Sequence, residues 1–554
     1  MDINIRIAGE AGQGLQTAGD LLVEAFASIR LHLLSTQSYM SRIRGGLNWY
    51  DIRISDHELF APRDDADLLV ALSDNALQEL RGSMMPEGLI IYDGEAEGTL
   101  TIHFDDVAKK VAGNAIMGNA VAAGAVFGLL GYDVQHLVDY LGTVFKQKGE
   151  EIITKNAACA RKGAELVASK SGLLKAPPGN DGSDYVADGA SAVGLGACTG
   201  GVKFVSAYPM SPSTAVLNYM ASMTEHYSVL VEQAEDEIAA MNMACGATYA
   251  GVPAMTTTSG GGFSLMVEAL SLAGMLELPV LVLLAMRPGP ATGLPTRTGQ
   301  EDLFPALHAG HGEFPRAIFA PGGLPEAYDC TRQALQIAHK YQSPVFVLVD
   351  QYLVDMHRNI PPLDPTYRPI DLMIDRTAGP DYVRYALTES GVSPRAIPGG
   401  EAFVLVDSDE HNEEGHVTED LSVRVKMVDK RLRKGEGMVA EALPPTYYGA
   451  PEAEHLLICW GSTYGACREA VDLLAERGQS LGLLHFSQVW PLNPDQITPH
   501  LQWRDRLTVV EGNATGQFRS ILAMQGLAMG AELMARYDGM PFTAREVMRR
   551  LGHE

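Results

Sequence analysis

The chain has 554 residues, which is too long for one compact domain, and about three or four domains of roughly 100–200 residues are expected. Hydrophobic residues make up 46% and charged residues 20%, the composition of a globular protein with ample apolar material for cores. Because 42 Lys and Arg face 68 Asp and Glu, the formal net charge is −26. This balance argues against a nucleic-acid-binding protein but leaves room for local basic pockets that bind an anionic ligand.

The sequence predicts a soluble, cytoplasmic protein. Its start, MDINIRIAGE, lacks the basic segment and apolar stretch of a signal peptide, and no apolar run approaches the ~20 residues of a spanning helix. Six scattered cysteines form no C-x-x-C pair. We therefore expect buried thiols rather than zinc or iron–sulfur ligands, and no redox centre on this chain.

In chain order, the elements predict an α/β protein with three α/β domains. Residues 1–169 begin as strand, glycine turn and helix, which favours a doubly wound domain, and residues 170–184 form a Gly- and Pro-rich linker. Apolar runs alternate with helical stretches over 185–362, as in parallel strands with crossover helices. Residues 363–445 are predicted to be an irregular connecting region, and 446–554 a last α/β domain.

Glycines cluster in Gly9-Glu10-Ala11-Gly12-Gln13-Gly14, between the first strand and the first helix. Such a turn lets backbone N–H groups approach a phosphate at the helix N-terminus, although an ordinary tight turn explains it as well. The spacing differs from G-x-G-x-x-G, and no acidic residue follows a second strand, so NAD is not predicted. Downstream, Arg42 and Arg44 beside paired glycines suit phosphate groups; the alternative is a solvated loop with two surface arginines.

Three loops rich in hydroxyl groups, glycine and proline follow predicted parallel strands. They are Tyr208–Thr214 (YPMSPST), Thr256–Gly262 (TTTSGGG) and Arg287–Thr296 (RPGPATGLPT). Ligands of α/β folds bind at the carboxyl ends of strands, and Arg287 would place a guanidinium there that suits a substrate carboxylate. The plainer alternative is a set of helix N-caps and proline turns.

Four acids in six residues precede a small apolar run in EQAEDEIAAMNMACGA, from Glu232 to Ala247. Acids at the start of a helix are usually solvated and favoured by the helix dipole. Glu237, however, is followed at once by the apolar run, and a carboxylate that enters a buried helix needs a partner. Both interpretations remain open at this point.

Two histidines, His411 and His416, lie among acids in DSDEHNEEGHVTED. The segment is polar and aperiodic, so a solvated or interface loop is predicted here rather than a metal site.

Taken together, YPMSPST, EDEIAAMNMACGA, TTTSGGG and RPGPATGLPT resemble the α-subunit signatures of 2-oxoacid:ferredoxin oxidoreductases. GEAGQG and SRIRGG resemble the γ domain of that family, here fused ahead of the α domains. This fusion, with GHVTED, looks most like the 2-oxoglutarate:ferredoxin oxidoreductase α subunit. The resemblance covers nearly the whole chain; it is specific in residues 185–362 and looser after Pro362.

The resemblance implies a central domain of the thiamine-diphosphate pyrimidine-binding type and a last domain like the transketolase C-terminal domain. Thiamine diphosphate would be shared with a β subunit that holds Mg²⁺ and [4Fe-4S] clusters, and coenzyme A and ferredoxin would take the acyl group and the electrons. A dimer of heterodimers is expected, because most stable oligomers are symmetric. The acidic surface places ferredoxin docking on the β subunit, since like charges repel.

Residue roles follow from the same resemblance. Glu237 matches the glutamate that hydrogen-bonds the aminopyrimidine ring and promotes deprotonation of the thiazolium carbon. The residues expected on the thiamine diphosphate side are Tyr208, Pro209, Glu237, Thr258 and Ser259. Those expected to bind substrate are Ser211, which stands where pyruvate-type relatives carry Thr, Thr257 and Arg287. Those expected to contact coenzyme A are Gly12, Gln13, Gly14, Arg42 and Arg44.

Three hypotheses about function stay open. The first is oxidative decarboxylation of 2-oxoglutarate to succinyl-CoA, or its reductive reversal with a low-potential donor. The second keeps this chemistry but changes the substrate to pyruvate, a branched-chain or an aryl 2-oxoacid. The third is a nucleotide-binding or assembly module without catalytic residues, which rests on the lack of a G-D-G metal motif and of a cysteine cluster.

Overall fold

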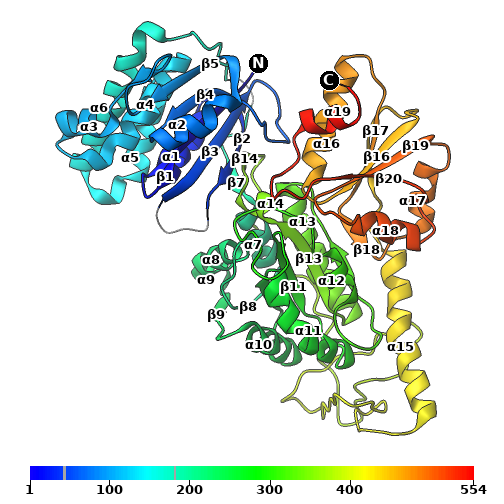
Figure 1. The fold of residues 1–554 in the computed structure, drawn as a ribbon. Helices are drawn as coiled ribbons and strands as arrows, with labels where there is room; N and C mark the ends of the chain where they lie inside the picture. Colours follow the sequence, from blue (N-terminus) through cyan, green and yellow to red (C-terminus); the bar gives the residue numbers. More distant parts are fainter. Residues whose placement is uncertain (41–44, 180–181, 554) are drawn as a thin grey trace. The chain divides into compact units, whose positions relative to one another are not determined.

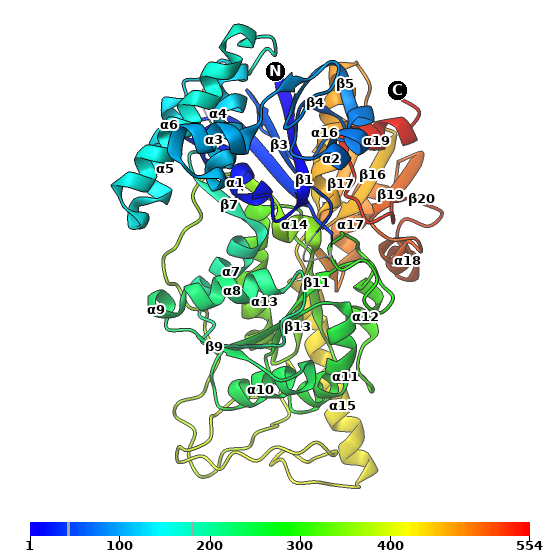
Figure 2. The ribbon, with the colours of Figure 1, turned by 60° about the vertical axis from the view of Figure 1, so that its left-hand side comes forward.

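The computed structural model describes residues 1–40, 45–179 and 182–553. They form two compact units, drawn in Figures 1 and 2. The first comprises Met1–Ala187 with two short later segments, Met356–Pro362 and Thr543–Glu546, and the second comprises the remainder. In the described part no single helix has the length and apolar character to cross a membrane, whereas one sharply bent pair, Phe104–Ala112 with Ala115–Leu130, meets that test jointly.

The first unit contains an eight-stranded sheet in the order β6-β5-β4-β1-β3-β2-β14-β7. Its strands are β1 (Asp2–Ala11), β2 (His32–Ser38), β3 (Gly45–Ser55), β4 (Ala66–Ala71), β5 (Met84–Tyr92), β6 (Leu100–Thr101), β7 (Val186–Asp188) and β14 (His357–Asn359). Its helices are α1 (Leu15–Ser28), α2 (Asp74–Leu80), α3 (Phe104–Ala112), α4 (Gly118–Leu130), α5 (Gln135–Val144) and α6 (Glu150–Val167).

The predicted strand, glycine turn and helix at the start of the chain are confirmed as β1 and α1. The sheet is mixed rather than wholly parallel, because β3 runs antiparallel to both β1 and β2. Helices α4 and α6 pack with their backbones in contact at two glycines. A Cβ on Gly124 would lie 1.9 Å from the Ala160 carbonyl oxygen, and one on Gly163 would lie 2.0 Å from that of Val121.

The central sheet of the second unit has the order β18-β12-β13-β11-β10-β8-β9, and all but β18 run parallel. Its strands are β8 (Phe204–Ala207), β9 (Leu230–Gln233), β10 (Ala254–Thr258), β11 (Leu281–Met286), β12 (Ala317–Phe319), β13 (Val345–Asp350) and β18 (Gln488–Trp490). Its helices are α7 (Gly189–Gly200), α8 (Thr214–Ser222), α9 (Thr224–Tyr227), α10 (Glu237–Tyr249), α11 (Gly260–Met275), α12 (Leu303–His308), α13 (Leu324–Tyr341) and α14 (Gln351–Asp355). The prediction of parallel strands with crossover helices is confirmed.

A third sheet, also in the second unit, has the order β15-β17-β16-β19-β20 and is parallel except for β15. Its strands are β15 (Thr446–Gly449), β16 (His455–Trp460), β17 (Gly482–Phe486), β19 (Arg506–Glu511) and β20 (Glu532–Ala535). The helices of this part are α16 (Thr463–Glu476), α17 (Pro494–Leu501), α18 (Gln517–Met524) and α19 (Ala544–Arg550). The α/β class with three sheets is thus as predicted.

The region predicted to be irregular contains one long helix. Residues 363–420 hold only turns, bends and two isolated bridges, but α15 (Leu421–Ala440), yellow in Figure 1, follows them. The buried face of α15 includes Lys430 and Lys434, both at most 1% exposed. Hydrophobic periodicity could not reveal this helix, because lysines occupy positions where an apolar stripe would be expected.

Buried charges hold α15 against the central domain. The Glu277 carboxylate, after α11, accepts hydrogen bonds from Lys430 Nζ at 2.6 Å and from Lys434 Nζ at 2.9 Å. Burial alone would raise the pKa of Glu277, but the charges of the two lysines hold it well below its usual range. Burial lowers the pKa of Lys430 and Lys434, and the charge of Glu277 opposes this shift. Each of the three groups therefore depends on the others for stabilisation in the interior.

Replacing Glu277 by Gln is expected to destabilise the chain by about 3–5 kcal/mol, because two lysines would remain buried without a counter-charge. Urea unfolding followed by circular dichroism measures this as a lower midpoint. Glu436→Gln is the matched control, because Glu436 is exposed on the same helix, and its effect should stay within about 0.5 kcal/mol. An equal midpoint for the two variants would contradict this account of α15.

Candidate functional site

Four neighbouring strands of the central sheet end at one edge, and predicted site residues follow each of them. Strands β11, β10, β8 and β9 are adjacent and parallel, so their carboxyl ends meet. Arg287 follows β11, Thr258 ends β10 and Ser259 comes directly after it. Tyr208–Ser211 follow β8, and Glu237 lies just beyond β9. The structure thus brings these predicted residues to a common sheet edge, at the carboxyl ends of the strands. Figure 1 labels β8, β9 and β11 of this sheet.

Glu237 is buried at the start of helix α10. It is 4% exposed, and its Oε1 has no hydrogen-bond partner in the described part of the chain. The preceding acids Glu232, Glu235 and Asp236 are exposed, and Asp236 caps the helix by accepting from Ala239 N at 2.7 Å. The interpretation as a solvated helix start therefore holds for these neighbours and fails for Glu237. A buried carboxyl oxygen without a partner is costly, so it is suited to hydrogen-bond a ligand.

The third glycine of TTTSGGG fits closely against this carboxyl group. A Cβ on Gly262 would lie 2.5 Å from Glu237 Oε1 and 2.3 Å from Thr258 Oγ1. Helix α11 can therefore approach both groups only because position 262 lacks a side chain. Sequence analysis did not single out this glycine, although it stands within a motif that the analysis did select.

The hydroxyl groups of β10 and of Ser259, which follows it, are all buried. Those of Thr256, Thr257 and Ser259 have no hydrogen-bond partner among the described residues, and Thr258 Oγ1 donates to the Ser259 carbonyl at 3.3 Å. Because side chains alternate along a strand, Thr257 points to the sheet face opposite Thr256 and Thr258. The Thr258 hydroxyl lies near Glu237, because both groups border the Cβ position of Gly262.

Arg287 and Ser211, both predicted to bind substrate, lie in contact. The contact joins the Arg287 side chain to the backbone of Ser211 and leaves the serine hydroxyl out. Arg287 Nη1 donates to the Ser211 carbonyl oxygen at 2.6 Å, while the Ser211 side chain is exposed. Burial lowers the pKa of Arg287, and the nearby Asp302 carboxylate opposes this shift. Tyr208 is 40% exposed and Pro209 is half-buried in the same loop. A ligand at this edge would therefore meet one arginine that is already fixed in position.

Asp302 is a site residue that sequence analysis missed. Its carboxyl group lies against the first residue of α11, since a Cβ on Gly260 would be 2.6 Å from both oxygens. Its Oδ2 is buried without a hydrogen-bond partner in the described structure. Burial, together with the charge of Glu301, raises the pKa of Asp302 to about 6, although Arg287 lowers it. In sequence, Glu301-Asp302 before a helix looks like an ordinary acidic helix start.

The segment between Arg287 and Asp302 is anchored to the third sheet. Gln300 Nε2 donates to the Trp460 carbonyl at 2.9 Å, and its Oε1 accepts from Gly512 N at 2.7 Å. Glu301 Oε2 accepts from Gly289 N at 2.8 Å and closes the loop on itself. The third sheet thereby fixes the loop that follows Arg287.

The predicted phosphate turn lies in the first unit. Gly12 and Gly14 have φ values of 97° and 73°, in the left-handed region that favours glycine. Gln13 Oε1 accepts from Glu10 N at 2.7 Å and its Nε2 donates to the Leu72 carbonyl at 3.3 Å, so this side chain stabilises the turn. Arg42 and Arg44 lie outside the described residues.

Other sequence-predicted features are placed as follows. His411, predicted to be solvated or at an interface, is fully buried, with its ring centroid 3.9 Å from that of Tyr385, whereas His416 is exposed. The burial of His411 against Tyr385 could not be read from its polar sequence neighbours. All six cysteines are buried, as predicted. Among the described residues, no group of three or more His, Cys, Asp or Glu is arranged to hold a metal ion.

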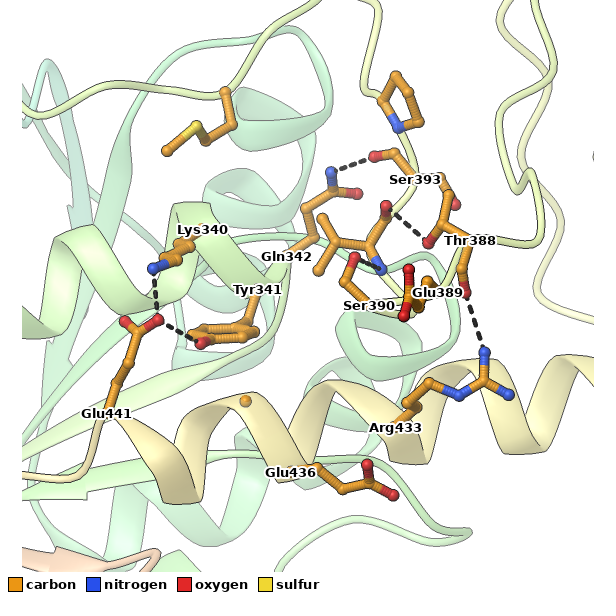
Figure 3. Close-up of a pocket in the computed structure, with 14 residues that line it drawn as sticks. Lys340, Tyr341, Gln342, Thr388, Glu389, Ser390, Ser393, Arg433, Glu436 and Glu441 are labelled. Atoms are coloured by element: carbon orange, nitrogen blue, oxygen red, sulfur yellow. Dashed lines mark hydrogen bonds and ion pairs between the residues drawn. The ribbon is translucent and has the colours of Figure 1, made fainter.

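A separate cavity of about 890 Å³ lies between the end of α13, residues 388–394 and α15 (Figure 3). It contains none of the predicted site residues. Glu441 there accepts hydrogen bonds from Lys340 and from the Tyr341 hydroxyl, and Arg433 donates to the Thr388 carbonyl. The edge near Glu237 is the better candidate, because several of its polar atoms, among them Glu237 Oε1 and Asp302 Oδ2, are buried without a partner among the described residues.

Three family models match the chain in succession. One described as pyruvate ferredoxin/flavodoxin oxidoreductase matches residues 4–166. One described as pyruvate flavodoxin/ferredoxin oxidoreductase, thiamine diP-binding, matches residues 195–430, which include the whole sheet edge described above. The third, pyruvate:ferredoxin oxidoreductase core domain II, matches residues 453–547.

Similar proteins align over almost the entire length. The 2-oxoacid:ferredoxin oxidoreductase subunit alpha of a Sulfolobus species is 32% identical, over 98% of this chain and 96% of its own. The 2-oxoglutarate oxidoreductase subunit KorA of Mycobacterium tuberculosis is 27% identical, over 97% of this chain and 91% of its own length. The solved 2-oxoglutarate:ferredoxin oxidoreductase from Magnetococcus marinus, with 2-oxoglutarate, coenzyme A and succinyl-CoA bound, superposes with a TM-score of 0.92 at 32% identity, covering 100% and 99%.

Replacing Gly262 by Ala tests the geometry around Glu237. The added Cβ would displace the carboxyl group, and a shift of about 1 Å at a reacting group costs up to about 10²-fold in rate. Reduction of a viologen dye by a 2-oxoacid, with thiamine diphosphate present, is the assay that the similar proteins suggest. Gly261→Ala is the control, because the nearest atom to its Cβ is 3.9 Å away. Equal rates for both variants would show that the fit at Gly262 does not matter.

Proposed function

Because the chain belongs to the 2-oxoacid:ferredoxin oxidoreductase family, we propose that it is the α subunit of a thiamine-dependent, CoA-acylating 2-oxoglutarate:ferredoxin oxidoreductase. The reaction converts 2-oxoglutarate, coenzyme A and oxidised ferredoxin to succinyl-CoA, CO₂ and reduced ferredoxin, and it is reversible. The choice of 2-oxoglutarate rests mainly on the full-length similarity to the Magnetococcus marinus enzyme, whose solved structure holds that substrate. KorA relatives with 2-oxoglutarate in their names support the same choice.

The residues at the sheet edge fit the pyrimidine side of thiamine diphosphate. The buried Glu237 Oε1 lacks a partner, which a pyrimidine ring nitrogen would supply, and Gly262 leaves no side chain in the way. When bound, thiamine diphosphate supplies the nucleophilic carbon that adds to the 2-oxo group and accepts the electrons released with CO₂. Glu237 holds or passes a proton at the ring nitrogen, in a site from which burial excludes water. Tyr208, Pro209, Thr258 and Ser259 would line this side.

Substrate binding is assigned to the opposite part of the same edge. Arg287, held by its bond to the Ser211 carbonyl, would bind a carboxylate of the 2-oxoacid, because guanidinium groups pair well with carboxylates. The exposed Ser211 hydroxyl and the unpartnered Thr257 hydroxyl are further hydrogen-bonding groups for substrate. Held by these groups, the substrate would present its 2-oxo carbon toward the Glu237 side.

We assign coenzyme A binding to the first unit of this chain, and the metal ion and clusters to a partner subunit. Coenzyme A contact is proposed at the turn of Gly12, Gln13 and Gly14, with Arg42 and Arg44; the open space around the Gly12 Cβ position is compatible with close approach of a ligand. Mg²⁺ and the [4Fe-4S] clusters are proposed on a partner β subunit, in a dimer of heterodimers, with ferredoxin docking there. The subunit names of similar proteins support a multi-subunit complex.

Pyruvate is the second candidate substrate, because all three matching family models carry pyruvate in their descriptions. A co-expressed complex with its β subunit should reduce a viologen dye with 2-oxoglutarate, and only when coenzyme A is present. Activity with pyruvate alone would keep the mechanism and overturn the proposed substrate. If the complex is stable and holds its clusters, but none of the 2-oxoacids tested supports dye reduction, the result would favour a role in assembly only.

Replacing Glu237 by Gln is expected to lower turnover by about 10²–10⁴-fold, the usual contribution of a positioned acid–base group. Glutamine keeps the size of the side chain but cannot exchange a proton, so the complex should still assemble. Glu235→Gln is the control, since Glu235 is exposed two residues earlier. Assembly is followed by gel filtration and turnover by viologen reduction. Wild-type rates in the Glu237 variant would rule out this role.

A further inference from the structure

Asp302 lies at the sheet edge with a buried oxygen that no group in the described part of the chain satisfies. It is the last residue before α12, and its carboxyl group lies against Gly260 at the N-terminus of α11. In the described structure Oδ2 has no hydrogen-bond partner. Buried polar atoms are nearly always paired, so an exception at a sheet edge calls for a functional explanation.

Three charged groups act on or near Asp302, each from a different segment. Glu301, its neighbour in the loop, repels the ionised carboxylate, and Arg287, after β11, attracts it. Glu237, at the start of α10, lies farther along α11, beside Gly262. Arg287 donates its hydrogen bond to the Ser211 carbonyl rather than to Asp302. The guanidinium therefore stabilises the carboxylate through its charge and keeps other N–H groups for a ligand.

The loop that carries Asp302 is held on both sides, which limits how far the carboxyl group can move. Gln300 is bonded to Trp460 and Gly512 of the third sheet, and Glu301 to the Gly289 N–H. An incoming substrate carboxylate at Arg287 would thus meet a second negative charge on a loop that is held in place. Two carboxylates beside one cation cannot both stay ionised without cost, and uptake of a proton relieves that cost.

We propose that Asp302 takes up a proton from water when the anionic 2-oxoacid binds at Arg287, and so couples substrate binding to pH. The inference rests on the proposed function, in which Arg287 holds a substrate carboxylate. Asp302 is a positioning residue here: once neutral, it leaves the charge of Arg287 to the substrate. Its O–H also becomes a donor in a site where its Oδ2 has no partner.

The direction of the pH effect follows from the pKa of Asp302, which burial raises to about 6. Below that pH the free enzyme already carries the proton, and above it the proton must be acquired on binding. Since kcat/KM reports the free enzyme, it should fall by up to about tenfold per pH unit above this pKa. This fall is the alkaline limb of the pH profile. Asp302→Asn mimics the protonated group, so the kcat/KM of this variant should lose the limb and exceed the wild-type value at high pH.

The test measures kcat/KM for 2-oxoglutarate in the assembled complex from roughly pH 5.5 to 8.5, which spans the raised pKa. Glu301→Gln provides a second variant that keeps Asp302 and an acceptor for Gly289 N–H. Removing the charge of Glu301 lowers the pKa of Asp302, so the limb should move to lower pH. Loss of the limb in Asp302→Asn and its shift in Glu301→Gln would support the proposal.

Other outcomes overturn it. An unchanged limb in Asp302→Asn would assign the titration to another group, and a uniform loss of kcat/KM at every pH would indicate a merely structural role. An unmoved limb in Glu301→Gln would argue against Asp302 even if the first variant fails to fold. A wild-type complex that turns over no 2-oxoacid would overturn the proposed function and this inference together. If the wild-type complex is active but the limb is unaltered in both variants, the inference is overturned and the proposed function stands.

Discussion

The burial of one carboxyl group without a partner is the constraint on which the candidate site depends. Glu237 begins α10 at the edge of the central sheet, and its Oε1 has no hydrogen-bond partner among the described residues. Gly262 allows α11 to approach this group, and Thr258 brings a hydroxyl beside it. The protein bears the cost of this arrangement, because an unsatisfied buried carboxyl group destabilises the fold. Such a cost is typical of a position that a ligand completes.

The remainder of the second unit holds this edge in place. Arg287 is fixed by the Ser211 carbonyl, and the loop that follows it is bonded through Gln300 to the third sheet. On the far side of the central domain, Glu277 binds the lysines of α15 and closes the end of α11. A rigid frame of this kind is what orientation of a substrate next to a cofactor requires, since small displacements of reacting groups are costly in rate.

Much of this could be predicted from sequence, where local pattern and chemistry agree. The apolar run that became β11, the glycine turn before α1 and the placement of Arg287 at a strand end follow from period, turn residues and the topology of parallel sheets. The residue pattern alone did not separate Glu237 from its solvated neighbours at the helix start, and the family resemblance selected it. Helix α15 could not be foreseen, because its buried face carries lysines whose partner Glu277 is distant in sequence. Asp302 was missed for the same reason: its environment is made by Gly260 and Arg287, which only the fold brings near.

The central claim is that Glu237 acts on the proton of thiamine diphosphate rather than only filling space. The most direct measurement is the rate at which the thiazolium C2 proton of bound thiamine diphosphate exchanges with D₂O, followed by NMR after acid quenching. The wild-type complex should exchange this proton rapidly, and the Glu237→Gln complex should do so about 10²–10⁴-fold more slowly, although both bind the cofactor. Equal exchange rates in the two complexes would contradict the account.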